Sequence, residues 1–323
     1  MSFDRLWIVT PVLLDVEPFL LLRERVRGVL ERDAGLRDAL VSFVVIDDSA
    51  GLDQSIGRLR ALDDVAVIEP PFQLGHQRAI VHGLRKIAPW TADEDVVVTM
   101  DADGEDRPED LPRLLEPLIG AEGEAGIVLA LRTRRRTSLP FKLLYVGFRI
   151  LFRLLTGTGV RTGNYAAYPA AVAKRLLLHP LFDLSYSSTF GALGVPVHYV
   201  PCERAERYAG ESRMGYAKLL LHGVRMLMPF VDRIAVRALV VFAVTLALGL
   251  GLAIAVVGVK LFTDEAIPGW TTYTLLGTLI VSLVSLGNFV TLFTIVSQAR
   301  ATSLANIEQF ENERSRVAPT ATD

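Results

Sequence analysis

The stretch VVVTMDADGEDRPEDL (Val96–Leu111) runs from a largely β-branched apolar segment directly into four carboxylates, Asp101, Asp103, Glu105 and Asp106. A buried strand that ends in clustered carboxylates is unfavourable unless a cation lies among them, because burial and mutual repulsion both oppose ionisation. Hard oxygen ligands suit Mg²⁺ or Mn²⁺, and such ions are usually shared with phosphate oxygens. The stretch therefore predicts a metal site with Asp101 and Asp103 as ligands and Glu105 as a third.

Short apolar runs alternate with helix-like segments around this stretch. The expected strands are residues 6–11, 41–48, 65–69, 96–101 and 126–131. The expected helices are residues 16–33, 52–62, 75–88 and 108–119. This alternation predicts an α/β fold with a mainly parallel, doubly wound sheet and helices on both faces. Ligands of such sheets bind outside the carboxyl ends of the strands, so a site is expected beside the acidic residues.

A second strand end and a helix start supply further polar groups at that edge of the sheet. Asp47 and Asp48 end one strand in the sequence IDDSAG, where a carboxylate can accept hydrogen bonds from a ribose or a base N–H. Gly75 opens a helix with His76 in its first turn, and the free backbone N–H groups there favour an anion or a nucleotide edge. Two acidic strand ends in one parallel sheet indicate a ligand site more strongly than either alone.

Basic residues follow in a block, since residues 125–182 contain no Asp or Glu. The run of Arg134, Arg135 and Arg136 leads into an amphipathic helix expected at 139–157, which predicts contact with anionic membrane lipids. No recognisable nucleic-acid-binding module accompanies the run, so nucleic acid is not an expected partner.

A polar, Gly-punctuated segment links the α/β region to a second amphipathic helix. Either its two arginines, Arg207 and Arg213, clamp a diphosphate bidentately, or the segment is a solvated loop. The helix that follows, at 213–230, either lies at the membrane interface or covers the domain's own core, and the same alternatives apply to 139–157. The neighbouring apolar spans favour the interface.

Two long uncharged runs, 238–259 and 266–299, are each long enough to cross about 30 Å of hydrocarbon as a helix. The alternative is a pair of buried helices in a large soluble protein. Arginines flank both ends of the pair, so the positive-inside rule places both termini and the α/β domain in the cytoplasm. The expected divisions are an α/β domain over 1–212, a juxtamembrane helix over 213–235, two transmembrane helices within 236–299 (about 237–260 and 272–297) and a polar tail over 300–323.

Composition sets further limits on the 323 residues. The single cysteine, Cys202, excludes an intramolecular disulfide and a multi-cysteine metal site. The residues are 51% hydrophobic, with the excess after about residue 236. The N-terminus has acids early and no signal-peptide pattern.

In combination these motifs resemble glycosyltransferase family two, with its GT-A nucleotide-sugar-binding fold. IVTP, which contains Thr10 and Pro11, is similar to the first-strand motif of that family. IDDSAG is similar to its nucleoside-binding motif, and MDADGED to its metal-binding Asp-x-Asp motif. More narrowly, the LGH loop and the pattern R-x-x-G-x-S-R at 207–213 resemble the polyprenyl-phosphate glycosyltransferases, the group of dolichol-phosphate mannose synthase and its bacterial membrane-anchored relatives.

The resemblance implies an inverting, metal-dependent transfer of a sugar from a UDP- or GDP-sugar to a polyprenyl phosphate at a bacterial inner membrane. It implies the following sites: Thr10, Pro11, Asp47, Asp48, Gly75, His76, Asp101 and Arg207 for the donor; Asp101, Asp103 and Glu105 for Mg²⁺ or Mn²⁺; Arg134, Arg135, Arg136 and Arg213 for the acceptor phosphate and the membrane; and Asp103, Arg213 and Asn164 for catalysis. The product would be a lipid-linked sugar donor for envelope glycans.

Two features depart from the family pattern. Leu14 and Asp15 replace an Asn-Glu pair after the first strand, and RTGNY has Arg161 and Asn164 where relatives often carry acids. An acidic base is therefore not assumed. A lipid monophosphate, with a second pKa of about 6, attacks without a strong base.

Other readings stay open at this point. The acceptor is either a prenyl phosphate or a different lipid such as diacylglycerol. A non-catalytic, membrane-anchored nucleotide-sugar binder is the alternative that the altered RTGNY segment supports. A processive polysaccharide synthase is disfavoured because two spans are too few for a channel. The apolar hairpin has little to bury against within the chain, which is compatible with a homo-oligomer.

Overall fold

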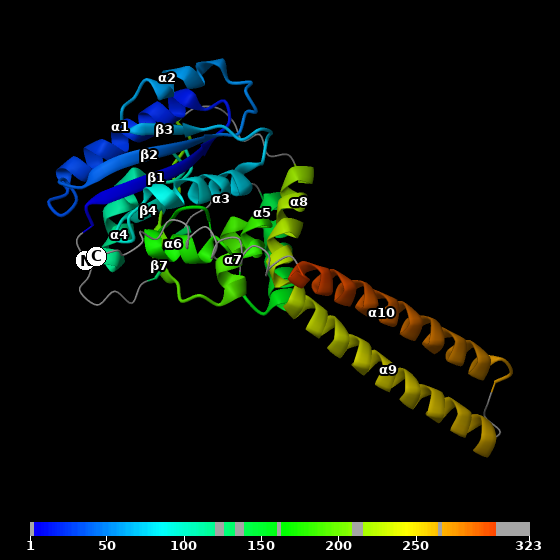
Figure 1. Ribbon diagram of the computed structural model, residues 1–323. Helices are drawn as coiled ribbons and strands as arrows, with labels where there is room; N and C mark the ends of the chain where they lie inside the picture. Colours follow the sequence, from blue (N-terminus) through cyan, green and yellow to red (C-terminus); the bar gives the residue numbers. More distant parts are fainter. Residues whose placement is uncertain are drawn as a thin grey trace, which may run out of the picture. The chain divides into compact units, whose positions relative to one another are not determined.

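The computed structural model describes residues 3–119, 126–132, 139–159, 163–208, 216–263 and 267–301. The predicted Arg134, Arg135, Arg136, Arg161 and Arg213 lie outside these residues. The chain divides into two units, one comprising Met1–Arg153 and Thr158–Pro229 and the other Leu154–Gly157 and Phe230–Asp323. Figure 1 shows the first as an α/β unit and the second as a pair of long helices.

The α/β unit is built on a seven-stranded mixed sheet in the order β3-β2-β1-β4-β6-β5-β7. Its strands are β1 (Arg5–Val12), β2 (Leu40–Asp47), β3 (Val65–Ile68), β4 (Val96–Thr99), β5 (Val128–Arg132), β6 (Ala166–Pro169) and β7 (His198–Cys202). All strand pairs are parallel except the two that β6 makes with β4 and β5. The prediction of a mainly parallel sheet is confirmed, and the antiparallel β6 and the parallel β7 are additions to the five predicted strands.

The helices of both units alternate with or follow these strands. The α-helices are α1 (Val16–Arg32), α2 (Gly57–Arg60), α3 (His76–Ile87), α4 (Leu111–Ile119), α5 (Leu139–Thr156), α6 (Ala170–Leu176), α7 (Tyr186–Leu193), α8 (Tyr216–Leu227), α9 (Val231–Phe262) and α10 (Trp270–Ala301). Short 3₁₀ helices lie at Gln54–Ile56, Ala88–Trp90, Pro108–Asp110, Pro180–Asp183 and Met228–Phe230.

Alternate residues of the central strands face two separate cores, one on each side of the sheet. Leu6 and Ile8 of β1 pack with side chains of α1, α2 and α4, whereas Trp7 and Val9 pack with those of α3, α6 and α7. This is the two-residue period of a strand that is buried on both faces. The predicted helices on both faces are confirmed (Figure 1).

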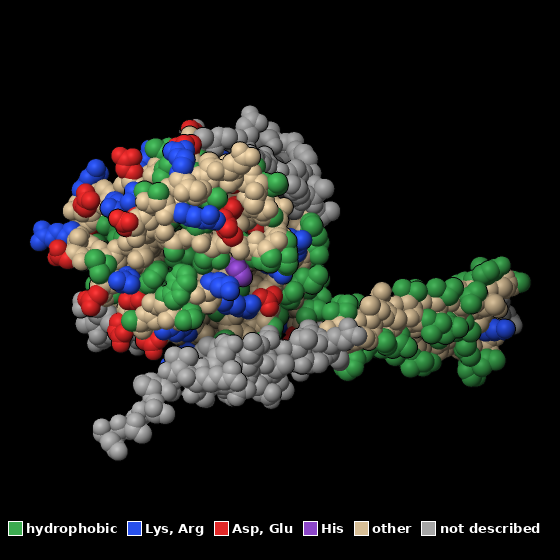
Figure 2. Space-filling model, turned by 45° about the horizontal axis from the view of Figure 1, so that its top comes forward, with side chains coloured by type: hydrophobic (Ala, Val, Ile, Leu, Met, Phe, Trp, Pro, Cys, Tyr) green, Lys and Arg blue, Asp and Glu red, His purple; other side chains and the backbone are tan. Residues whose placement is uncertain are grey.

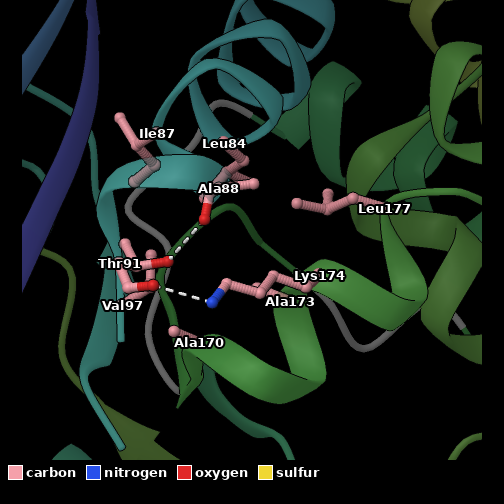
Figure 3. Close-up of a pocket in the computed structure, with 9 residues that line it drawn as sticks. All are labelled: Leu84, Ile87, Ala88, Thr91, Val97, Ala170, Ala173, Lys174 and Leu177. Atoms are coloured by element: carbon pink, nitrogen blue, oxygen red, sulfur yellow. Dashed lines mark hydrogen bonds between the residues drawn. The ribbon is translucent and has the colours of Figure 1, made fainter. Parts of the chain in front are cut away.

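Helix α3 lies close to the sheet because Gly83 has no side chain. A Cβ at that position would lie 2.5 Å from Ile46 Cδ1 and 3.3 Å from Val9 Cγ1. Beyond Gly83, a small cavity of about 10 Å³ separates α3 from α6 (Figure 3). Its volume suits at most one water molecule, so it is not a substrate pocket. It is lined by Leu84, Ile87, Ala88, Thr91, Val97, Ala170, Ala173, Lys174 and Leu177.

The second unit contains two helices that are long and apolar enough to cross a membrane. The segments Leu221–Phe262 and Trp270–Ile295 reach mean hydropathies of 2.7 and 2.0 over 18 residues, with 6% and 0% of those windows buried. Both windows are thus apolar and largely exposed, and the first segment begins in α8, before the second unit. Phe242 and Phe289 stack between α9 and α10 with ring centroids 6.4 Å apart. Figure 2 shows hydrophobic side chains over the visible face of this pair and charged ones scattered over the α/β unit.

A buried hydrogen bond fixes the start of β4, the strand that leads to the acidic residues. Trp7 Nε1 donates to Asp95 Oδ2 at 2.8 Å, and the same oxygen accepts from Ala92 N at 2.9 Å. Both Trp7 and Asp95 are buried. The bond therefore connects β1 to the loop that precedes β4.

We expect Trp7→Phe to lower the free energy of unfolding by about 1–3 kcal/mol, because it leaves a buried carboxylate oxygen with one donor fewer. Trp90→Phe is the matched control, since Trp90 is half exposed. Denaturant unfolding in detergent measures both. Equal stability of Trp7→Phe and the wild type would contradict this role of the bond.

Candidate active site

The three predicted metal ligands lie together just beyond the carboxyl end of β4. One carboxylate oxygen from each of Asp101, Asp103 and Glu105 lies within 4.8 Å of the other two. The loop turns back at Gly104, which has a φ of +87° that favours glycine. Asp103 Oδ1 accepts from Glu105 N at 3.0 Å, and Asp106 Oδ2 accepts from Asp101 N at 3.0 Å. These bonds hold the turn that brings the carboxylates together.

This cluster carries an electrostatic penalty that a cation would relieve. Burial raises the pKa of Asp103, and the negative charges of Asp101 and Glu105 raise it further, against the hydrogen bond from Glu105 N and the charge of Arg207. The donor set consists of hard carboxylate oxygens, which are the ligands that Mg²⁺ and Mn²⁺ prefer. The residues present therefore fit a divalent ion of that class.

Two arginines of the segment before α8 lie directly against these acids. Arg207 Nη2 lies 3.0 Å from Asp103 Oδ2, and its Nε donates to Glu105 Oε1 at 3.0 Å. Arg204 also pairs with Glu105. Tyr208 N donates to the Asp103 carbonyl at 2.8 Å. The predicted phosphate-binding Arg207 is thus placed beside the predicted metal ligands.

Glycine is required at position 104 for a second reason. A Cβ there would lie 2.5 Å from the ring of Tyr208. The ring of Tyr208 in turn lies under the guanidinium of Arg25, 4.6 Å from its centroid. Neither Arg204 nor Tyr208 was among the predicted site residues, because only the folded chain brings them to the Asp103–Glu105 turn.

The strand end of β2 carries two aspartates with different surroundings. Asp48 accepts from Leu74 N at 2.6 Å and from Gly75 N at 2.9 Å, so its carboxylate holds the turn into α3. Burial raises the pKa of Asp48, against these two hydrogen bonds and the nearby His76. Its direct contact with a nucleoside stays a prediction, whereas its hold on the turn is a structural finding.

Asp47 and Thr10 present buried polar atoms at the same edge. Asp47 Oδ1 accepts from Ser49 N at 3.0 Å. In the part of the chain that the structure describes, Asp47 Oδ2 and Thr10 Oγ1 are buried without a hydrogen-bond partner. Buried polar atoms of this kind are ordinarily paired. They are therefore candidates to bind a ligand, whereas Pro11, between them in the sheet, offers no N–H donor.

The first residue of α3 meets the acidic residues. His76 Nε2 lies 2.9 Å from Asp101 Oδ1 and 2.6 Å from Asn164 Nδ2, and Asn164 Nδ2 donates to Asp101 Oδ1 at 3.4 Å. Partial burial disfavours the imidazolium, but the carboxylates of Asp101, Asp103 and Asp106 outweigh it and raise the pKa of His76. Gly75, just before it, has a φ of +82°.

Asn164, which stands where relatives often carry an acidic residue, lies beside Asp101 and His76. Its backbone carbonyl accepts from Thr99 Oγ1 at 2.6 Å, which fixes it beside the end of β4. On α8, burial and the charge of His76 both lower the pKa of His222. The described site thus unites Asp101, Asp103, Glu105, His76, Asn164 and Arg207.

A model of glycosyl transferase family 2 matches residues 8–177, more than half of the chain. The uncharacterized glycosyltransferase YkcC of Bacillus subtilis is 31% identical over 234 residues, which are 68% of this chain and 68% of that protein. The undecaprenyl-phosphate 4-deoxy-4-formamido-L-arabinose transferase of Sodalis glossinidius is 27% identical over 226 residues, 68% of this chain and 66% of that protein. The undecaprenyl-phosphate mannosyltransferase of Micrococcus luteus is 30% identical over 201 residues, 55% of this chain and 79% of that protein.

The family match runs from within β1 to the end of α6 and includes the acidic turn, the start of α3 and Asn164. The mainly parallel sheet, covered on both faces, is the architecture that the GT-A resemblance implied. On these grounds the chain belongs to glycosyltransferase family 2.

Proposed function

We propose that this chain transfers a sugar from a nucleotide diphosphate sugar to a polyprenyl phosphate at the cytoplasmic face of a bacterial inner membrane, with inversion at the anomeric carbon. The observation that carries the proposal is the carboxylate cluster of Asp101, Asp103 and Glu105 in a chain that also holds two membrane-length apolar helices. Two relatives named as undecaprenyl-phosphate sugar transferases support the acceptor.

The donor diphosphate belongs beside the acidic turn. Asp101 and Asp103, with Glu105, would hold Mg²⁺ or Mn²⁺. Bound there, the ion supplies Lewis-acid stabilisation of the departing diphosphate. Arg207, which pairs with Asp103 and Glu105, could bind a phosphate oxygen of the donor in place of one of these carboxylates. Thr10 Oγ1 and Asp47 Oδ2 are suited to receive the nucleoside.

The acceptor supplies its own nucleophile. Asn164 cannot act as a general base, since an amide has no basic lone pair at neutral pH. A lipid monophosphate with a second pKa of about 6 is already largely dianionic. What the reaction needs is positioning of that phosphate against the anomeric carbon. Arg225 of α8 and the predicted Arg213 are the cations suited to this.

Helices α5 and α8 are suited to lie at the membrane interface. They pack on each other where Phe148 contacts Gly223, 3.0 Å from an added Cβ. Large apolar side chains stay exposed on both, including Val146, Ile150, Leu221 and Val224. Exposed apolar residues beside Arg149, Arg153 and Arg225 form the pattern of an interfacial helix. This surface would meet the lipid that carries the acceptor phosphate.

The proposed topology places α9 and α10 as a transmembrane hairpin. The arginines that flank the pair and the acidic connector assign both ends to the cytoplasm by the positive-inside rule. The catalytic domain (1–212), the juxtamembrane helix (213–235) and the polar tail (300–323) then share one side. The acidic turn would act on a cytoplasmic donor and a membrane-embedded acceptor.

We expect Asp103→Asn to lower metal-dependent transfer by about 100-fold or more, because an amide oxygen replaces a charged ligand of the ion that stabilises the leaving group. The assay combines purified protein, radiolabelled UDP- and GDP-sugars, undecaprenyl phosphate and Mn²⁺ or Mg²⁺, and counts lipid-soluble label. Asp38→Asn is the matched control, since 93% of the Asp38 side chain is exposed.

Other outcomes of that assay separate the competing functions. Full transfer by Asp103→Asn, or full wild-type transfer in excess chelator, would contradict the metal site. Transfer to diacylglycerol in place of undecaprenyl phosphate would identify a different lipid acceptor. Donor binding with no transfer to either lipid would identify a nucleotide-sugar binder.

We expect Arg207→Gln to weaken nucleotide diphosphate binding about tenfold or more, because a hydrogen bond to a charged group contributes about 1.5–3 kcal/mol. The same change removes a positive charge from Asp103 and Glu105, so Mn²⁺ binding should be retained or strengthened. Titration calorimetry with Mn²⁺ alone and with nucleotide measures both. Arg37→Gln, on an exposed side chain, is the control. A parallel loss of Mn²⁺ and nucleotide binding would contradict a phosphate role.

A further inference from the structure

The side chain of Gln77, one residue after His76, uses every polar atom that it has. Its Nε2 donates to Asn164 Oδ1 at 3.1 Å and to Ser187 Oγ at 2.9 Å. Its Oε1 accepts from Ser185 Oγ at 2.9 Å and from Ser187 N at 3.4 Å. The amide therefore joins three segments that are far apart in the sequence: the start of α3, the residues before β6 and the start of α7.

The α7 end of this network is buried and hydrogen-bonded within itself. Ser185, Ser187 and Ser188 are all buried. Ser188 Oγ donates to Ser185 Oγ at 2.8 Å. Thr189 Oγ1 also donates to the Ser185 carbonyl. Gln77 is thus anchored on a packed helix start rather than on a mobile loop.

The other end of the network reaches the acidic turn through Asn164. An amide has one accepting and one donating end, so occupation of Asn164 Oδ1 by Gln77 turns Asn164 Nδ2 toward the site. There it donates to Asp101 Oδ1 and lies beside His76 Nε2. The hydrogen bond from Thr99 to the Asn164 carbonyl holds the backbone at the same place.

We propose that Gln77 is a positioning residue for the Asp101 carboxylate and acts on it through Asn164. The inference rests on the proposed function, in which Asp101 is a metal ligand. Partners that orient metal-ligating groups ordinarily contribute 10- to 100-fold to metal affinity. Gln77 touches neither the carboxylates nor, in the proposed site, the donor, so its effect requires the Asn164 amide.

The test is Mn²⁺ binding to the full-length protein in detergent, without donor or acceptor, followed by the electron paramagnetic resonance signal of free Mn²⁺. The variants are Gln77→Met, Asn164→Ala and the double variant, with Gln54→Met as the control on an exposed glutamine. We expect Gln77→Met and Asn164→Ala each to weaken binding about tenfold, and the double variant to be no weaker than Asn164→Ala alone.

A second variant covers the event that Gln77→Met does not fold. Ser187→Ala removes one hydrogen-bond partner of Gln77 and leaves Gln77 and its contact with Asn164 in place. We expect this variant to lose Mn²⁺ affinity as well, but by a smaller factor. Thermal unfolding of each variant accompanies the titrations, since a loss of affinity at unchanged stability is not expected of a residue that only packs.

The outcomes separate this inference from the proposed function. Wild-type-like Mn²⁺ affinity of Gln77→Met, beside normal binding by the wild type, would overturn the role of Gln77 alone. Additive losses in the double variant would show that Gln77 does not act through Asn164 and would equally overturn it. Failure of the wild type to bind Mn²⁺ would contradict the metal site, and both proposals with it.

Discussion

Three carboxylates held within 4.8 Å of one another at the end of a buried strand are the constraint on which the rest of the site depends. Their mutual repulsion has to be offset, and the chain does so with Arg204 and Arg207 from the segment before α8. That pairing draws a remote segment onto the acidic turn and explains why Gly104 leaves room for Tyr208. A divalent ion would compete with Arg207 for the same oxygens, so metal binding and release of Arg207 are linked by charge.

The start of α3 gathers the second half of the site around the same carboxylates. Asp48 holds the turn before the helix through two backbone N–H groups. The helix then delivers His76 to Asp101 and Gln77 to Asn164. Because Gly83 lets α3 lie close to the sheet, these contacts are set by the packed core and not by a loop. The fold thereby gives the buried polar groups of the site hydrogen-bond partners in place of water.

The apolar runs predicted β1 to β5, because strands that are buried on both faces are continuous apolar segments. The parallel arrangement of these strands then predicted that the acidic residues at their ends lie at one edge of the sheet. The antiparallel β6 was missed, since AAYP is four residues long and has no distinctive period. Its pairing of Thr99 with Ala166 is what brings Asn164 to Asp101. The contacts of Asp48, Gln77 and Arg204 depend on tertiary pairings that no local pattern contains.

The most direct test of the account is the position of the metal. Anomalous scattering at the manganese edge, from crystals of the protein with Mn²⁺ and a nucleotide diphosphate, locates the ion independently of turnover. The account predicts one peak at coordination distance from the Asp101 and Asp103 carboxylates, with the diphosphate on its far side. A bound diphosphate held by Arg207 with no metal peak at these carboxylates would contradict it.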